Sequence, residues 1–524
     1  MIVRIILNLF THGNMESQTP PESTSENSYE QERRAKAHKM RELGVEPFGL
    51  RTEGLLPLAK VRELHKPEFG QDGGPEVTAA GRIIFLKRFG KLSFLTVRDE
   101  TGLMQFALDK KRLSETAWKI QDLLDLGDQI VVTGKLGQTK TGEVTVWASG
   151  LAMGSKSFLP PPAKWEGLTD VEIRYRQRYV DLWSNPEVMK LAQLRIRIID
   201  EMRSFLKARG FLEVETPMLQ PIHGGAAARP FITHSNALDL KLYMRIAPEL
   251  YLKRLLVGGF SKVFEVNRNF RNEGISPRHN PEFTMLEAYE AYGNWETMAE
   301  LVESMICHIA QTVFGTLKIE HKDAEGNVRK TINLAGDTSK PVGQRWRRAR
   351  VADLVEERTA WKFTKEAATS EQIADLRSKN PGKDLKLNGS PAEQLIEVYE
   401  KLIEPTLVDP CFVTQVPSVI IPLARKNPAD PFFCDVYELA INGQEISPGY
   451  TELNDPDVQR EKLMDQVGDK EERQEIDEDF LTALKYGMPP AGGLGLGIDR
   501  LIMMLTGAES IRDVILFPLM RPQS

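Results

Sequence analysis

Cysteine is scarce in this 524-residue sequence, which contains Cys307, Cys411 and Cys434. The number is odd and no Cys-x-x-Cys pair occurs, which argues against a disulfide framework or a zinc site and favours a reducing compartment. No run of eighteen apolar residues occurs either, so no membrane-spanning helix is predicted. The apolar start MIVRIILNLF is not followed by a small-residue cleavage site, and we expect translation to begin at Met15.

An excess of positive charge is also missing. A net charge of −6 and a pI near 5.9 do not indicate a nucleic-acid binder, so any RNA contact must come from local basic patches. Neither GxGxxG nor a Walker A sequence occurs, which excludes a Rossmann or P-loop nucleotide site. The chain has a mass of 59.2 kDa and 41% hydrophobic residues, which is enough to form the cores of two or three domains.

The first 73 residues are predicted to form a disordered leader and a helical extension. Residues 1–27 form a disordered leader, since Ser, Pro and Glu dominate from Met15 onward. Residues 28–73 form a helical extension, whose helix begins with a Ser28–Gln31 capping box and ends before Gly44. The basic residues of this helix are compatible with a solvated helix or with an arm that contacts phosphates.

Five short strands alternate with turns between residues 74 and 155, and an amphipathic helix separates the third strand from the fourth. This order predicts an OB-fold β-barrel, a class that binds single strands by stacking bases on aromatic side chains while basic residues follow the phosphates. Arg82 opens a local basic run, and Phe94 and Gln105 lie on the adjacent strands. Phe94 fits the outer binding face and the barrel core equally well.

A Pro-rich linker, residues 156–167, is predicted to separate the barrel from a large domain at 168–524. Within that domain, a long helix with one apolar stripe should begin at Asn185 and Pro186 and end before Gly210. The polar stretch at about 316–405 reads as an insertion, with helices near 351–357 and 391–402.

Residues 270–289, FRNEGISPRHNPEFTMLEAY, have the most unusual pattern of the large domain. Arginine, histidine and glutamate alternate there around an aromatic residue. Turn residues in the middle and alternating apolar residues on both sides predict a β-hairpin. A guanidinium fixed beside a carboxylate and an aromatic ring suits recognition of a nucleotide phosphate. A charged hairpin exposed to solvent is the alternative.

This segment, as FRNEG followed by RHNPEFTMLE, resembles motif 2 of the class II aminoacyl-tRNA synthetases and is most similar to bacterial-type lysyl-tRNA synthetases. GFLEVETPMLQPIHGGAAARPF, residues 210–231, resembles motif 1, and GGLGLGIDRLIMML, residues 492–505, resembles motif 3. The ordered match spans roughly 77–518, and the class I signatures HIGH and KMSKS are absent. The resemblance implies an α+β fold, in which an N-terminal OB-fold anticodon-binding barrel precedes a class II catalytic domain with an antiparallel β-sheet flanked by helices.

The resemblance also implies an ATP site in motifs 2 and 3. Arg271 and Arg500 are the implied catalytic residues, and Arg271 would bridge the substrate carboxylate and the α-phosphate. Phe283 would stack on adenine, and Arg500 would cover its other face and reach the γ-phosphate. The remaining implied ATP-binding residues are Glu273, His279, Asn280 and Glu438.

Glu438 and Glu445 lie on either side of a predicted turn at Asn442 and Gly443. The resemblance assigns both to Mg²⁺, a hard cation that carboxylate and phosphate oxygens suit. Without the resemblance, the same two glutamates would be read as a solvated pair.

For the amino acid, the implied lysine-binding residues are Gly225, Glu249, Glu287, Tyr289, Tyr450 and Glu452. A carboxylate pair facing the ε-ammonium would exclude neutral side chains because a buried charge would go unpaired, whereas ornithine would be rejected by only about 1–3 kcal/mol. One position departs from the family. Pro448 replaces an Asn two residues before the aromatic Tyr450, which removes a side-chain amide and a backbone donor from the pocket wall.

The resemblance therefore implies a cytoplasmic homodimer, paired through motif 1, that uses ATP and Mg²⁺ to attach L-lysine to tRNA(Lys) through a lysyl-adenylate, releasing pyrophosphate and AMP. Arg82, Phe94 and Gln105 would bind the anticodon.

Three alternatives remain. Class II ligases that lysylate a protein lack the OB domain, and aspartyl or asparaginyl enzymes are disfavoured because Glu249 and Glu452 would repel an acidic substrate. A non-catalytic RNA-binding relative would not need Arg271, Glu438, Glu445 and Arg500.

Overall fold

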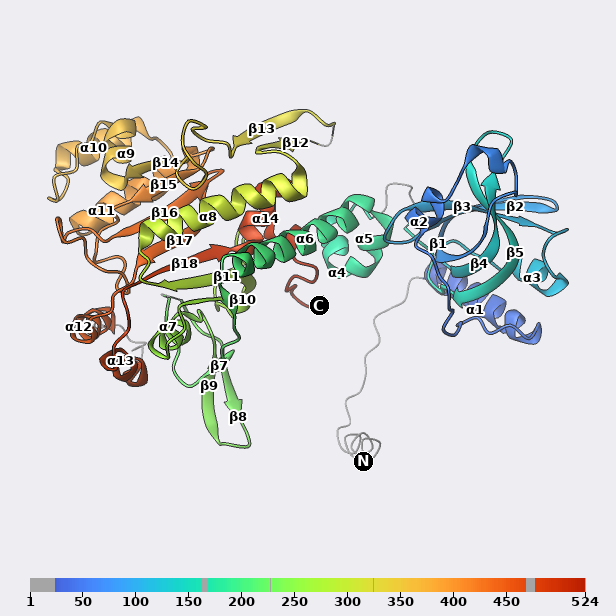
Figure 1. The fold of residues 1–524 in the computed structure, drawn as a ribbon, viewed down its shortest axis with the longest axis horizontal. Helices are drawn as coiled ribbons and strands as arrows, with labels where there is room; N and C mark the ends of the chain where they lie inside the picture. The colour runs from blue at the N-terminus through green and yellow to red at the C-terminus, as the bar shows by residue number, and fades with distance from the viewer. Residues whose placement is uncertain (1–23, 163–167, 227, 324, 468–475, 524) are drawn as a thin grey trace. The chain divides into compact units, whose positions relative to one another are not determined.

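The computed structural model describes residues 24–162, 168–226, 228–323, 325–467 and 476–523 (Figure 1). Its fold divides into two compact units between Met189 and Lys190. None of the described helices is both long enough and apolar enough to cross a membrane.

The first unit contains the predicted barrel. Its strands close in the order β1-β2-β3-β5-β4, and the helix α3 follows β3, as the sequence predicts for an OB-fold. The elements of this unit are α1 (Thr24–Glu42), α2 (Leu58–Glu63), a 3₁₀ turn (Pro67–Phe69), β1 (Glu76–Phe89), β2 (Leu92–Arg98), β3 (Leu103–Asp109), α3 (Glu115–Gln121), β4 (Gln129–Gln138), β5 (Val144–Ser155), α4 (Val171–Arg176) and α5 (Arg178–Ser184).

Side chains alternate along β2 between the barrel core and the outer face. Leu95 and Val97 are buried in the core, whereas Phe94, which directly precedes Leu95, points to the other face of the strand and is half-buried. The Phe94 ring makes edge contacts with Phe89 and Trp147, with centroids 6.3 and 6.2 Å away. The strand register therefore decides between the two positions that the sequence left open, and places Phe94 outside the core.

The helix α1 begins at Thr24, so the predicted capping box at Ser28 does not start it, and Thr24–Asn27 are helical rather than part of a leader. Polar residues such as these oppose a helix only weakly. The rest of the predicted leader, residues 1–23, lies outside the described residues. Arg33 Nη1 donates to the carbonyl oxygens of Leu126, Ser157 and Leu159 at 3.0–3.2 Å, which ties the helix to the barrel.

The predicted linker begins inside the barrel unit. Lys156 is fully buried, and its Nζ lies 2.7 Å from carboxylate oxygens of both Asp125 and Asp128. After the linker, Arg98 Nη1 donates to the carbonyl oxygen of Trp183 at 2.8 Å. These contacts extend the first unit to Met189, beyond the boundary expected at residue 168.

An eight-stranded sheet forms the centre of the second unit, in the order β14-β15-β16-β17-β18-β11-β10-β6. Its inner pairs are antiparallel, and the two outermost pairs are parallel. The strands are β6 (Leu212–Glu213), β10 (Lys262–Phe270), β11 (Glu282–Ala291), β14 (Arg347–Arg350), β15 (Cys411–Thr414), β16 (Val436–Ile441), β17 (Gln444–Thr451) and β18 (Ala491–Gly497). The stretch 316–405, which the sequence predicts to be an insertion, contributes β14 to this sheet. It is therefore an insertion only in part.

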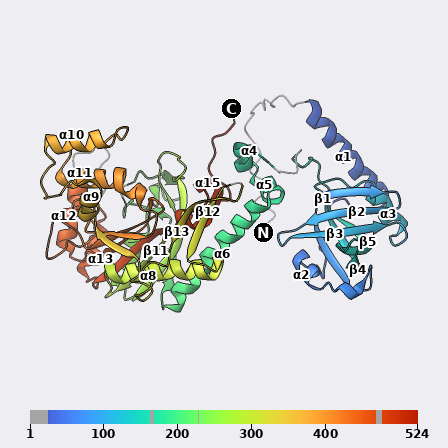
Figure 2. The ribbon, with the colours of Figure 1, turned by 90° about the horizontal axis from the view of Figure 1, so that it is seen from above.

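One face of the sheet is covered by α6 (Pro186–Ala208), α8 (Trp295–Ile309) and α14 (Ile498–Thr506), which share a hydrophobic core with the strands. At the β14 end, α9 (Val351–Thr359), α10 (Ser370–Lys379) and α11 (Pro391–Val398) gather around a second cluster (Figure 2). π-Helical turns follow α8 and α11 at Ala310–Phe314 and Tyr399–Ile403, and a 3₁₀ turn spans Glu404–Thr406.

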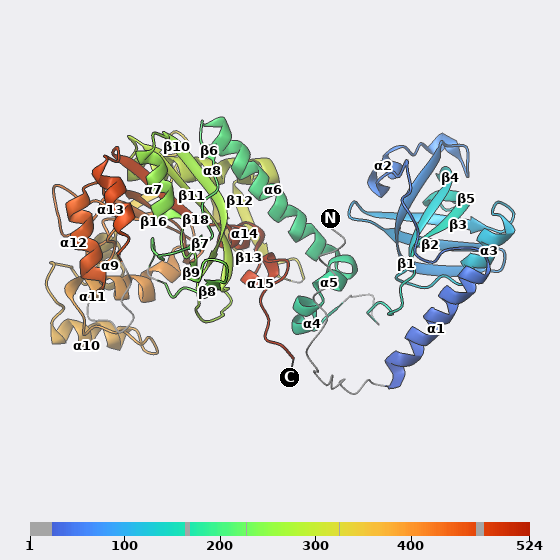
Figure 3. The same cartoon turned by 90° about the horizontal axis from the view of Figure 1, so that it is seen from below.

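On the other side of the unit, α7 (Glu249–Val257), α12 (Pro456–Val467) and α13 (Glu478–Lys485) lie side by side (Figure 3). Two small sheets complete the unit. One has three strands in the order β7-β9-β8, with β7 (Leu219–Gln220), β8 (Ile232–Ser235) and β9 (Leu240–Met244), and the other pairs β12 (Lys318–Lys322) with β13 (Val328–Asn333). The last helix is α15 (Ile511–Val514).

Candidate active site

Two adjoining cavities open on the face of the sheet opposite α8. The larger has a volume of about 310 Å³ and the smaller about 210 Å³. Both are lined by Arg271, Met285, Glu445 and Pro448, so these residues form the boundary between them.

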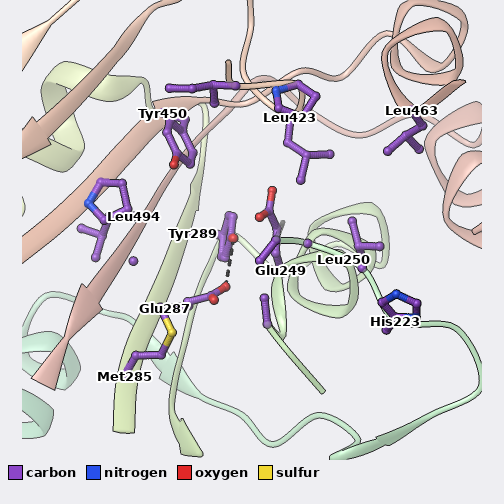
Figure 4. Close-up of a pocket in the computed structure, with 18 of the residues that line it drawn as sticks. His223, Glu249, Leu250, Met285, Glu287, Tyr289, Leu423, Tyr450, Leu463 and Leu494 are labelled. Atoms are coloured by element: carbon purple, nitrogen blue, oxygen red, sulfur yellow. Dashed lines mark hydrogen bonds between the residues drawn. The ribbon is translucent and has the colours of Figure 1, made fainter. Parts of the chain in front are cut away.

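The strand β11 explains how one segment can serve both the core and a cavity. Leu286 and Ala288 are fully buried in the core, whereas Met285, Glu287 and Tyr289 point into the larger cavity (Figure 4). Alternation along a strand produces this division. The hairpin of β10 and β11 is paired from Lys262 to Glu290, as the sequence predicts.

Arg271 directly follows β10, and its backbone N–H donates to the Pro281 carbonyl oxygen at 2.8 Å. Its guanidinium lies 5.1 Å from the centre of the Phe283 ring. The buried Nε has no hydrogen-bond partner within the described part of the chain. Burial lowers the pKa of Arg271 from its ordinary value, an effect that nearby Glu273, Glu287 and Glu445 oppose. A buried donor without a protein partner is suited to an anionic ligand.

Arg500 enters the smaller cavity from the first turn of α14, directly after the glycine-rich β18, as predicted. Its Nη1 donates to the Glu445 carbonyl oxygen at 3.1 Å, and its Nη2 lies 3.1 Å from His279 Nε2. Because a guanidinium can only donate, Nε2 of His279 accepts, and its Nδ1–H points to Ser276 Oγ, 2.8 Å away. Burial, followed by the charge of Arg500, lowers the pKa of His279, which agrees with a neutral ring.

Sequence reasoning missed the residues that hold this arginine in place. Asp499, its neighbour, accepts from the Thr284 backbone N–H at 2.7 Å and forms an ion pair with Arg195 of α6 at 2.5 Å. Thr284 and Asp499 also line the smaller cavity. The available signal was the aspartate that directly precedes the motif 3 arginine in the sequence.

Glu438 and Glu445 lie on the hairpin of β16 and β17, and both Asn442 and Gly443 at its turn have positive φ, as a two-residue hairpin requires. The segment at 316–405 adds Glu404, whose Oε1 accepts from the Glu445 N–H at 2.6 Å. Burial, with Glu445 and Glu404 close by, raises the pKa of Glu438 to about 8.

This surplus of negative charge and the oxygen donors fit a divalent cation. Among the described residues, however, no three His, Cys, Asp or Glu side chains form a complete metal site. The pair of glutamates therefore fits a cation that also takes oxygens from phosphates or water.

Comparison with known proteins identifies the family. Residues 170–521 match the model for class II tRNA synthetases (D, K and N), and residues 77–152 match the OB-fold nucleic acid binding domain. The chain is 46% identical to the lysine–tRNA ligase of Carboxydothermus hydrogenoformans, over 93% of this chain and 97% of the relative. Identity to the lysine–tRNA ligase of Bacillus subtilis is 45%, over 94% and 97%, and to that of Staphylococcus haemolyticus 44%, over 94% and 99%.

The chain belongs to the lysine–tRNA ligases. The family predicted from the three motifs is confirmed, and so are the two domain types.

Five of the six residues predicted to bind lysine line the larger cavity of this lysine–tRNA ligase family member: Gly225, Glu249, Glu287, Tyr289 and Tyr450. The Tyr289 hydroxyl donates to Glu287 Oε2 at 3.1 Å (Figure 4). Burial, with Glu249 nearby, raises the pKa of Glu287 well above its ordinary value. Glu249 occupies the first turn of α7, and its carboxylate points into the cavity.

The sixth residue, Glu452, is 1% exposed and does not line the cavity. Its Oε2 forms an ion pair with Lys253 Nζ at 2.5 Å, and Lys253 also donates to Glu249 Oε1 at 2.7 Å. The two carboxylates that were expected to face a substrate ammonium thus share an ammonium of the chain itself. The sequence offered a signal for half of this network, since Glu249 and Lys253 are four residues apart on one helix.

Pro448 lies opposite Glu438 in the register of β16 and β17. Pairing between β17 and β18 extends over Gly449–Thr451, beyond Pro448, which has no N–H to donate. Ser447, the residue before Pro448, donates from its Oγ to the carbonyl oxygen of Gly495 on β18 at 2.5 Å. At position 448, the boundary between the two cavities therefore presents an apolar ring rather than a hydrogen-bond donor.

In the smaller cavity, the predicted ATP-binding residues Glu273, His279, Asn280 and Phe283 join Arg271 and Arg500. Glu438 lines neither cavity. It lies on β16, and the neighbouring strand β17 carries Glu445. Asn280 is buried, and its amide donates to the Glu282 carbonyl oxygen at 2.6 Å while its Oδ1 has no partner among the described residues.

In the barrel, Phe94 and Gln105 lie on adjacent paired strands, and Gln105 Oε1 accepts from Thr145 Oγ1 at 2.8 Å. Arg82 differs from the expectation of a free phosphate-binding side chain. It donates to the Gly127 carbonyl oxygen at 2.7 Å, and its guanidinium covers the Trp183 ring at 4.9 Å. These contacts leave Arg82 half-buried.

Proposed function

We propose that this chain attaches L-lysine to tRNA(Lys) with ATP, through a lysyl-adenylate, in the two adjoining cavities. Membership of the lysine–tRNA ligases supports the overall reaction. One observation supports the placement of the reaction: Arg271 lines both cavities, and its buried Nε has no partner among the described residues. One guanidinium can therefore bridge a carboxylate in the larger cavity and a phosphate in the smaller one.

In the first step, a carboxylate oxygen of lysine attacks the α-phosphorus of ATP. A new O–P bond forms, the bond to pyrophosphate breaks, and pyrophosphate leaves with the electron pair. Arg271 offsets the repulsion between the two anions and stabilises the charge of the transition state. In the second step, a hydroxyl of tRNA attacks the carbonyl carbon of the adenylate, and AMP leaves.

The smaller cavity would hold ATP. Phe283 offers a ring on which adenine can stack, and Glu273 and Asn280 offer polar atoms for its edge. Arg500 covers the other face of the base and, with His279, meets the outer phosphates. A neutral His279 adds no second full charge beside Arg500, and its one N–H, which points to Ser276 Oγ, would have to leave that partner to donate to a phosphate.

Glu438 and Glu445 would hold Mg²⁺ together with phosphate oxygens. When bound, this ion supplies charge neutralisation for the β- and γ-phosphates. Glu404 would keep the Glu445 backbone in place through its short hydrogen bond.

The larger cavity would select lysine. Glu249 and Gly225 are adjacent, since a Cβ on Gly225 would lie 3.1 Å from that of Glu249, so both can meet the same end of the substrate. Glu287, Tyr289 and Tyr450 surround the inner part, and Glu452 adds negative charge behind it. A neutral side chain in this place would leave buried carboxylates without compensation.

For tRNA, Phe94 and Gln105 would stack on and read anticodon bases at the outer face of the barrel. Arg82, which is bound to Gly127 and Trp183, would support that face and leave phosphate contacts to the exposed Lys87.

A homodimer through motif 1 is part of the proposal. Several apolar side chains of this region are 41–62% exposed, which suits a surface that a second copy covers. They are Leu212, Met218, Leu219, Ile232 and Leu240. We place the enzyme in the cytoplasm, in agreement with its family's role in translation and with its three unpaired cysteines.

The experiment that tests this proposal is amino-acid-dependent ATP–pyrophosphate exchange, with all twenty amino acids and ornithine in the presence of Mg²⁺. Exchange with lysine, strong loss in Arg271→Ala and transfer to tRNA(Lys) are expected. Exchange with another amino acid would contradict the lysine pocket, and unchanged exchange in Arg271→Ala would contradict the role of Arg271.

A further inference from the structure

Lys253 lies behind the larger cavity and has no role in the reaction described above. It belongs to α7 and is 0% exposed. Its Nζ is 2.7 Å from Glu249 Oε1 and 2.5 Å from Glu452 Oε2, so one ammonium holds carboxylates from elements about 200 positions apart in the chain.

Such a buried ionic network is a poor means of stabilising a fold. Removing a lysine and two glutamates from water is costly, and apolar residues of similar size are often as stable or more stable. At this position, however, Glu249 borders a cavity and Glu452 has an Oε1 without a hydrogen-bond partner among the described residues. The network therefore fits a role in the chemistry of the cavity.

The geometry points to Lys253 as a positioning residue that determines specificity: it holds Glu249 and Glu452 as two fixed anions, so that the pocket accepts one further ammonium. This inference rests on the proposed lysine-binding roles of the two glutamates. Lys253 touches neither substrate nor the reacting atoms and acts through its partners.

The physical reason is charge balance. Two carboxylates and one internal ammonium leave one net negative charge, which a single substrate ammonium neutralises. Without Lys253, two neighbouring buried carboxylates cannot both stay ionised, and one takes up a proton. The pocket then presents a hydroxyl donor to an ammonium that is itself a donor, and neither carboxylate is held in position.

The test uses Lys253→Met, which keeps the length of the side chain and removes its charge. Lysine-dependent ATP–pyrophosphate exchange should show KM for lysine raised about tenfold or more, since contacts to charged groups are at stake. KM for ATP should change by less than about twofold, because the smaller cavity contains no part of the network. A general loss of structure would raise both constants.

The matched control is Lys262→Met. Lys262 also forms an ion pair, with Glu290 Oε1 at 2.6 Å, but its partner Glu290 does not line the cavity, whereas Glu249, the partner of Lys253, does. This variant should keep KM for lysine within about twofold. Lysine KM unchanged in Lys253→Met, or raised equally in both variants, would overturn the inference.

Lys253→Met alone leaves an uncompensated buried charge and can fail to fold. The double variant Lys253→Met/Glu452→Gln removes one charge of each sign. The double variant keeps a net charge of −1 in the pocket but leaves Glu249 without the ammonium that positions it, so KM for lysine should stay well above that of the unmodified chain. A double variant with the unmodified KM for lysine would overturn the inference, because net charge alone would then set binding.

Glu249→Gln and Glu452→Gln separate this inference from the proposed function. If neither changes KM for lysine, the proposed pocket itself is wrong. If both raise KM for lysine while Lys253→Met does not, the pocket stands and only the role of Lys253 is refuted.

Discussion

Gly493 offers a direct test of the packing behind the lysine pocket. It lies on β18, and a Cβ at this position would be 2.0 Å from Glu452 Oε1 and 2.5 Å from a ring carbon of Tyr289. The first distance is about 1.4 Å inside the 3.4 Å at which ordinary contact begins. Since both neighbours are buried, Gly493→Ala must push the Glu452 carboxylate or the Tyr289 ring out of place.

Two effects of known size follow. Overpacking of a buried site lowers the free energy of unfolding by about 1–3 kcal/mol. Displacement of Glu452 weakens its pairing with Lys253 and with the substrate ammonium, and the loss of a contact to a charged group, about 1.5–3 kcal/mol, raises KM for lysine roughly 10- to 150-fold.

The assay is ATP–pyrophosphate exchange with lysine varied at saturating ATP and then ATP varied at saturating lysine, alongside thermal unfolding. Gly150→Ala in the barrel is the control, since the Cβ would meet only Thr133 Cβ at 3.6 Å. We expect KM for lysine to rise in Gly493→Ala while KM for ATP stays within about twofold. An unchanged KM for lysine, with the variant folded, would refute the reasoning.

Four further predictions concern other parts of the enzyme. Arg271→Lys loses the planar fork between the two cavities, and kcat for exchange should fall about 10²- to 10³-fold, whereas a loss under tenfold would contradict the bridging role. Burial raises the pKa of Glu452 to about 7, so its carboxylate takes up a proton as the pH falls below that value. kcat/KM for lysine should therefore decline from pH 8 to 6, and Glu452→Gln should flatten this profile. Phe94→Ala removes an outer-face ring of the barrel and should lower kcat/KM for tRNA about tenfold, with exchange unchanged as the internal control. Pro448→Asn restores an amide at the boundary of the cavities and should lower KM for lysine, a result that an equal or higher KM would contradict.

The sequence alone determined the elements that depend on local order. Alternating apolar residues and turn chemistry predicted the barrel strands and the β10–β11 hairpin, because a period of two survives in any sheet. Arg271 and Arg500 were named from the resemblance to motifs 2 and 3, and they lie at a strand end and in a first helical turn. The turn at Asn442 and Gly443 was equally predictable, since positive φ restricts residue choice.

Only the tertiary structure decided which side chains meet. Phe94 lies on the outer face because Leu95 and Val97 take the core face of β2, and only the closed barrel shows which face of the strand is the inner one. Arg82 is bound to Trp183, and the first unit extends to Met189, because residues after the linker pack on the barrel side of the division.

The pairing of Lys253 with Glu452 shows the limit most clearly. Glu452 was assigned to the substrate because the family resemblance implied that role. Its partner Lys253 lies on α7, about 200 positions earlier in the chain, and meets Glu452 only in the folded unit. Charge in a buried site is set by all neighbours together, and those neighbours come from distant parts of the chain, so local sequence cannot specify the balance.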